Sequence, residues 1–119
     1  MNRRSFIYQA CGVSLSLPVL ARPARVTYLD QIGLQLYTRR NSIGQNLAKT
    51  IDEVAKIGYK QVEPYGFPSD QAIEMIKRSR DQGMQVNSSH FTWDSLLNPE
   101  KKGIKPIEEV LELARKHGL

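Results

Sequence analysis

Cysteine is almost absent from this chain of 119 residues, which contains a single one, Cys11. One cysteine cannot form a disulfide within the chain and cannot build a thiolate-rich zinc site. It also lies in an N-terminal segment that precedes the predicted fold. The stability of the fold is therefore expected to come from packing, from a metal with other ligands, or from partners.

The chain also lacks the glycine-rich fingerprints of nucleotide-binding proteins. The first predicted strand, residues 32–37, is followed by the sequence TRRNSIG at residues 38–44. Neither G-x-G-x-x-G nor G-x-x-x-x-G-K-[ST] is present there. The sequence therefore gives no support for a dinucleotide site or a P-loop.

No apolar run is long enough for a stable membrane span. The longest apolar stretch, residues 6–20, is interrupted by Gln9, Ser14, Ser16 and Pro18. It falls short of the roughly 20 apolar residues that a span requires. Paired arginines, Arg3 and Arg4, precede it, and small or apolar residues at 19–21 suit a signal peptidase. We predict an export leader over residues 1–21 that resembles the twin-arginine type, a linker over 22–31, and an exported protein of the bacterial periplasm. A membrane anchor is the alternative reading of this segment.

The charge of the chain is mildly positive. Its formal net charge is +5, and cleavage of the leader after Ala21 would leave 98 residues with a charge of +3. The basic residues are scattered along predicted helices, as on a solvated face, and do not form a stripe. We therefore expect no nucleic-acid partner.

A repeated strand and helix pattern fills the rest of the chain. Alternating apolar residues predict strands at 32–37, 60–64 and 84–89, and apolar residues at helical spacing predict a helix after each strand. The helical stripes are Leu47, Ile51, Val54 and Ala55 in the first, Ala72, Ile73 and Ile76 in the second, and Ile107, Val110, Leu111 and Ala114 in the third. Gly58, Gly83 and Gly118 follow the helices, as left-handed C-caps do. The order βαβαβα predicts an α/β fold with parallel strands, and we read the chain as the front part of a larger protein.

Local signals mark the ends of two of these helices. Ser69 is expected to cap the start of the second helix, and Pro106 to be the first residue of the third. The third helix should carry acidic residues near its start and basic residues near its end, as the helix dipole favours.

A doubly wound sheet and an eight-stranded barrel share this order of elements. Without a nucleotide fingerprint, the barrel is favoured, because its chemistry gathers where the strands end. Polar side chains occur at each of these strand ends: Gln35 and Tyr37 on the first, Glu63 and Tyr65 on the second, Ser88 and His90 on the third.

Three segments carry a resemblance to a known family. They are IGLQLY at residues 32–37 followed by Arg39 and Arg40, VAKIGYKQVE at residues 54–63, and GMQVNSSH at residues 83–90. Together they resemble the xylose-isomerase-like barrels, the sugar phosphate isomerase and epimerase family. The resemblance implies that residues 32–119 are the first three βα units of a (β/α)8 TIM barrel.

The same resemblance implies an activity and a cofactor. Family members use a divalent metal, Mn, Mg, Zn or Co, to polarise a sugar carbonyl while a base moves a proton on the neighbouring carbon. In many members the metal ligands and catalytic glutamates come from later strands, beyond Leu119 of this chain. We expect a sugar or sugar derivative as substrate for the full-length parent, and neither a metal nor activity for this chain alone.

Glu63 and His90 are the candidate catalytic residues. Glu63 would aid substrate binding or proton transfer, or it would only fix the loop at residues 64–69. His90 would contact substrate, bind a metal as in the endonuclease branch of the family, or hold a loop.

Four further residues are candidates for substrate binding: Gln35, Tyr37, Tyr65 and Trp93. If the leucines of the first strand pack under the helices, Gln35 and Tyr37 point to the opposite, inner face. A purely structural hydrogen bond is an equal possibility for Gln35. The rings of Tyr65 and Trp93, with Phe91, would stack on a sugar or would simply cover the end of the core.

Two other functions stay open at this point. The chain could be a non-catalytic carbohydrate-binding or assembly module built on the same fold. It could also be an exported phosphodiesterase of the endonuclease branch, for which a larger set of histidines would be needed.

Overall fold

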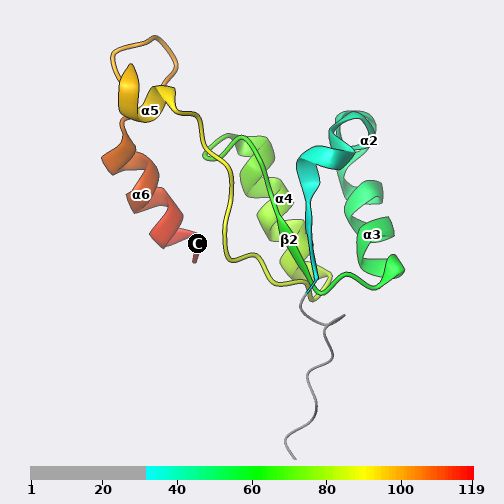
Figure 1. The fold of residues 1–119 in the computed structure, drawn as a ribbon. Coiled ribbons are helices and arrows are strands. Elements are labelled where there is room, and N and C mark those ends of the chain that lie inside the picture. Colours follow the sequence, from blue (N-terminus) through cyan, green and yellow to red (C-terminus); the bar gives the residue numbers. More distant parts are fainter. Residues whose placement is uncertain (1–31) are drawn as a thin grey trace, which may run out of the picture.

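The computed structural model describes residues 32–119, which form a mixed α/β arrangement around a small parallel sheet (Figure 1). The sheet contains β1 (Gly33–Gln35) and β2 (Gln61–Glu63). Its register pairs Gly33 with Gln61, Leu34 with Val62 and Gln35 with Glu63. The predicted leader at 1–21 and linker at 22–31 lie outside the described residues.

Helices connect and flank the strands. Among residues 32–119 they are the 3-10 helix η2 (Leu36–Arg39) and the α-helices α2 (Arg40–Gln45), α3 (Leu47–Ile57), α4 (Asp70–Asp81), α5 (Asp94–Leu97) and α6 (Ile107–Lys116). The first strand is shorter than predicted, because the chain turns into η2 directly after Gln35. The short helices η2, α2 and α5 were not predicted.

Helix α3 follows the sequence pattern closely. Asn46 caps its start, where the side-chain oxygen accepts a hydrogen bond from the Lys49 N–H at 2.9 Å. Ile51 and Val54 are buried in the core. Gly58 ends the helix with φ 114°, a left-handed conformation that favours glycine. The predicted end of this helix at Gly58 is confirmed, and the other two residues of its predicted stripe, Leu47 and Ala55, are half-buried against the core.

Helix α4 also begins where the sequence predicts. The hydroxyl of Ser69 accepts a hydrogen bond from the Ala72 N–H at 3.2 Å, which confirms Ser69 as the N-cap. Ala72 and Ile76 are fully or almost fully buried, and Met75, which was not predicted in the stripe, is buried with them. Helices α3 and α4 pack against each other beside the sheet, so that Leu34 and Val62 face a shared core.

The third predicted strand, 84–89, is not a regular strand, and together with His90 it forms what we call the third segment. It pairs with β2 at one isolated parallel bridge, Gln61 with Gln85, and a second isolated parallel bridge, Phe67 with Phe91, lies beyond both stretches. The Val62 N–H donates to the Gln85 carbonyl at 2.9 Å, and residue 64 would supply the next N–H of such a ladder. Residue 64 is proline and has no N–H, so the ladder is interrupted there.

Helix α6 is present, but its predicted buried face is partly wrong. Val110 is buried and Ile107 is half-buried, whereas Leu111 is 61 % exposed. Leu113 packs on the core instead. Pro106 is the N-cap residue and not the first helical residue, one position from its predicted place. The predicted charge pattern, acidic in the first turn and basic in the last, is confirmed.

Candidate functional site

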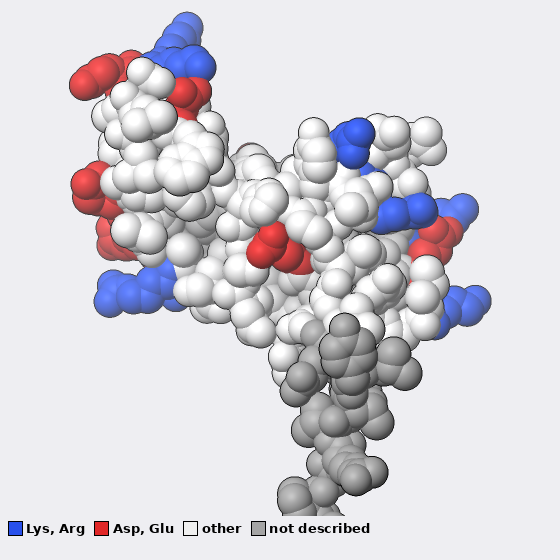
Figure 2. All heavy atoms as spheres, in the orientation of Figure 1, with Lys and Arg blue, Asp and Glu red and all other residues white. Residues whose placement is uncertain are grey.

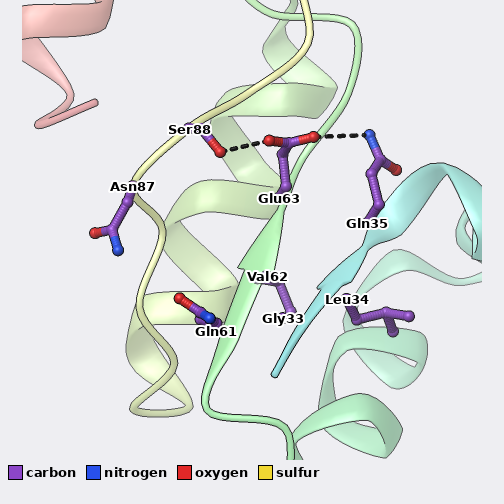
Figure 3. Close-up of a pocket in the computed structure, with 8 residues that line it drawn as sticks. All are labelled: Gly33, Leu34, Gln35, Gln61, Val62, Glu63, Asn87 and Ser88. Carbon is purple, nitrogen blue, oxygen red and sulfur yellow. Dashed lines mark hydrogen bonds between the residues drawn. The ribbon is translucent and has the colours of Figure 1, made fainter. Parts of the chain in front are cut away.

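A hollow of about 310 Å³ lies on the face of the sheet opposite the core. Residues of β1, β2 and the segment after Val86 line it: Gly33, Leu34, Gln35, Gln61, Val62, Glu63, Asn87 and Ser88 (Figure 3). In the space-filling view an acidic patch lies at the centre of this face, where β2 runs, and the basic side chains lie nearer the rim (Figure 2). The hollow is therefore a polar site with an acidic centre.

The register of the sheet brings Gln35 and Glu63 together. They are direct partners on parallel strands, and partners in register project from the same face. The Gln35 Nε2 group donates to Glu63 Oε1 at 3.4 Å. The other atom of the amide, Oε1, accepts from the backbone N–H of Tyr37, so Gln35 also caps helix η2. Gln35 thus has a role in both the site and the local fold.

Ser88 approaches Glu63 from the opposite side. Its hydroxyl donates to Glu63 Oε2 at 2.5 Å, and Figure 3 shows Glu63 between Ser88 and Gln35. Strict alternation would place Ser88 with the buried residues Met84 and Val86, on the core face. The interrupted ladder allows both Asn87 and Ser88 to line the hollow. The irregularity of the third segment therefore brings Ser88 to Glu63.

His90 completes the cluster. Its Nε2 lies 3.1 Å from Glu63 Oε1, and its Nδ1 lies 3.2 Å from Gln35 Nε2. Its backbone is held by a bond from its own N–H to the Pro64 carbonyl at 3.1 Å. The side chain of His90 is 64 % exposed and that of Glu63 is 32 % exposed, so a ligand can reach both. The two predicted catalytic residues are in contact.

The predicted aromatic residues divide into two groups. The rings of Tyr37 and Tyr65 meet edge to face, with centroids 5.3 Å apart, beside the Glu63 cluster. The guanidinium of Arg40 lies 4.6 Å from the Tyr37 ring centroid, and Tyr37 is 52 % exposed. Trp93 is 70 % exposed at the start of α5. Its ring has no contact with the Glu63 cluster among residues 32–119.

Ser88 and Arg40 were not among the predicted site residues. Ser88 was noted at the end of the third strand, but the expected alternation gave no reason to select it. Arg40 was noted only as part of a family segment. Its position three residues after Tyr37, on a helical turn, is the signal that could have identified the contact.

Glu63 and His90 by themselves do not make a metal site. Residues 32–119 contain no group of three or more histidine, cysteine, aspartate or glutamate side chains placed to hold a metal ion. A catalytic zinc site uses about three protein ligands, and this cluster offers at most two. A metal bound here would need further ligands from outside the described residues.

Comparison with models of protein families, with curated proteins and with solved structures gave no match. Within the part of the chain that the structure describes, no helix is long and apolar enough to cross a membrane.

Proposed function

We propose that residues 32–119 are part of a xylose-isomerase-like barrel, and that the complete protein isomerises or epimerises a sugar or sugar derivative. The contact between Glu63 and His90 at 3.1 Å carries this proposal. Glu63 is the last residue of β2 and lines the polar hollow, and His90 contacts it from the neighbouring parallel segment, as catalytic groups do at the C-terminal face of a barrel. The family resemblance of the three sequence segments supports the same conclusion.

The cluster has the groups that this chemistry needs. Isomerisation and epimerisation both remove a proton from the carbon beside a carbonyl. Isomerisation returns a proton to the neighbouring carbon, and epimerisation returns one to the opposite face of the same carbon. A carboxylate such as Glu63 can accept a proton, or a hydrogen bond from a sugar hydroxyl. The imidazole of His90 can form a hydrogen bond to a neighbouring sugar oxygen. The divalent metal that the family implies would polarise the carbonyl, and its ligands would lie outside the described residues.

The character of the hollow favours a neutral polyol over a polyanion. Glu63 is the one charged residue among the eight that line it, so the hollow offers a phosphodiester no cationic partner. Exposed Tyr37 beside the cluster also suits the apolar face of a sugar ring. The exposed ring of Tyr37 equally supports the second candidate function, a carbohydrate-binding module without catalysis.

To test this, the complete protein with added Mn²⁺ is incubated in D₂O with each of a panel of aldoses and ketoses. NMR then measures the exchange of solvent deuterium into the sugar. Exchange that is lost in Glu63→Gln and kept in Lys56→Ala, an exposed position on α3, would support the isomerase. Saturable sugar binding without exchange would support the binding module. Absence of both, or cleavage of DNA, would contradict the proposal.

A further inference from the structure

We infer that Gln35 is a positioning residue that fixes the proton of His90 on Nε2. The inference concerns the same cluster as the proposed function and deepens it, but it follows from hydrogen-bond geometry and is tested without any measurement of activity.

The orientation of the Gln35 amide is decided by the backbone. The N–H of Tyr37 can only donate, so the atom of Gln35 that it meets must be the oxygen. The amide nitrogen is then directed to the other side, where it lies 3.4 Å from Glu63 Oε1 and 3.2 Å from His90 Nδ1. An exchanged amide would place two donors against each other at Tyr37.

This orientation determines which ring nitrogen of His90 carries hydrogen. The Gln35 Nε2 group has only hydrogens to offer, so His90 Nδ1 must accept with its lone pair. In a neutral imidazole the proton then lies on Nε2, the ring nitrogen that is 3.1 Å from Glu63 Oε1. The contact with Gln35 is satisfied in this tautomer and in no other.

The fixed tautomer has a chemical consequence. The lone pair of Nδ1 is occupied by Gln35, and Nε2 carries the proton. His90 therefore presents no free lone pair to a metal ion unless the contact with Gln35 is first broken. In this arrangement Gln35 holds His90 in a form that does not ligate a metal.

The experiment is a two-bond ¹H–¹⁵N correlation spectrum of the ¹⁵N-labelled chain at alkaline pH, where imidazoles are neutral. The chain contains two histidines, so the variant His117→Gln assigns the signals of His90. We expect an unprotonated Nδ1 and a protonated Nε2 for His90, with a scalar coupling across the hydrogen bond between Nδ1 and Gln35 Nε2. A protonated Nδ1 in the unmodified chain would overturn the inference.

A variant isolates the part played by Gln35. In Gln35→Glu, one carboxylate oxygen still accepts from Tyr37, so the cap of η2 is kept, but the group facing His90 becomes an acceptor. Nδ1 of His90 should then gain a proton. The matched control Ser88→Ala removes a donor from Glu63 without contact to the ring, and should leave Nδ1 unprotonated. An unprotonated Nδ1 in a folded Gln35→Glu chain would also overturn the inference. If that variant does not fold, the coupling in the unmodified chain decides.

Discussion

Gln35 and Glu63 are direct register partners on two parallel strands, and their side chains meet at 3.4 Å on the polar face of the sheet. Two residues 28 positions apart in the chain are thus brought into contact by backbone pairing alone. Because the strands are rigid and their partners in register are fixed, the cluster does not depend on a mobile loop for its first two members. Ser88 and His90 are added by the third segment, which is less regular.

The first prediction concerns catalysis in the complete protein. Replacing His90 with Ala removes the imidazole that lies 3.1 Å from Glu63 and should lower turnover more than it lowers stability, because the His90 side chain is 64 % exposed and not part of the core. The loss of a positioned group corresponds to about 2 to 4 kcal/mol of transition-state stabilisation, or roughly 30-fold or more in rate. Steady-state kinetics and thermal unfolding of the same samples would measure both effects. An equal loss in Lys56→Ala would contradict a specific role for His90.

The second prediction concerns two buried hydroxyl groups. Ser79 on α4 is fully buried and its Oγ has no hydrogen-bond partner among the described residues, whereas the Thr50 hydroxyl donates to the Asn46 carbonyl at 2.8 Å. Ser79→Ala should raise the free energy of unfolding by about 1 kcal/mol, because it removes an unpaired buried polar group. Thr50→Val should lower the free energy of unfolding by a similar amount, because it removes a buried hydroxyl that has a hydrogen-bond partner. Urea unfolding of the two variants distinguishes these outcomes, and a destabilised Ser79→Ala would contradict the assignment.

Much of this fold could be predicted from sequence because its signals are local. The cap at Ser69, the left-handed glycine at Gly58 and the buried stripe of α3 all follow from the identity of nearby residues. The prediction of a regular third strand was wrong because the pairing of that strand depends on a residue distant in the sequence. Pro64 lies on another segment and withholds the N–H that the ladder needs.

The candidate site shows the same division. Glu63 and His90 were selected because polar residues follow predicted strands, and the structure brings them together. Ser88 could not be selected on alternation, because the change of face between Val86 and Ser88 arises from the interrupted ladder. Leu111 was misplaced for a related reason: three- and four-residue spacings define more than one helical stripe, and tertiary packing selects the one that contains Leu113.

The third prediction concerns the ion pair between α3 and α4. Arg78 donates to both carboxylate oxygens of Asp52, at 2.8 and 2.5 Å, and this hydrogen bonding raises the pKa of Arg78 above its usual value. The neighbouring pair, Glu53 and Arg39, is separated by 4.0 Å. A double-mutant cycle on Asp52 and Arg78 should give a measurable, salt-sensitive coupling energy, and the same cycle on Glu53 and Arg39 should give almost none. Equal coupling in both cycles would show that the bidentate geometry is unimportant.

The fourth prediction concerns the docking of α6. The guanidinium of Arg80 donates to the carbonyls of His117, Val86 and Gly118 at 2.6, 3.0 and 3.1 Å, and so ties the end of α6 to α4 and to the third segment. Arg80→Met should increase hydrogen exchange of the α6 amides about tenfold, since the lost bonds are worth about 1.4 kcal/mol. Exchange in α3 should not change. Uniformly faster exchange in both helices would mean that Arg80 supports the whole fold and not α6 in particular.

The last prediction concerns the response of α5 to acid. Asp94 accepts hydrogen bonds from Lys101 at 2.7 Å and from Asn98 at 2.9 Å, and these bonds hold the pKa of Asp94 below its usual value. A carboxyl group whose pKa is depressed in the folded state stabilises the fold above its ordinary pKa, and this contribution is lost as the pH falls through the depressed value. Trp93, the single tryptophan of the chain, adjoins Asp94, so its fluorescence should report the transition.

We expect an acid transition below the usual aspartate range of about pH 4, which moves to higher pH in Lys101→Ala and disappears in Asp94→Asn. Lys102→Ala is the matched control and should leave the midpoint in place. A midpoint that is the same in Lys101→Ala as in the unmodified chain would show that the lysine does not hold the carboxylate.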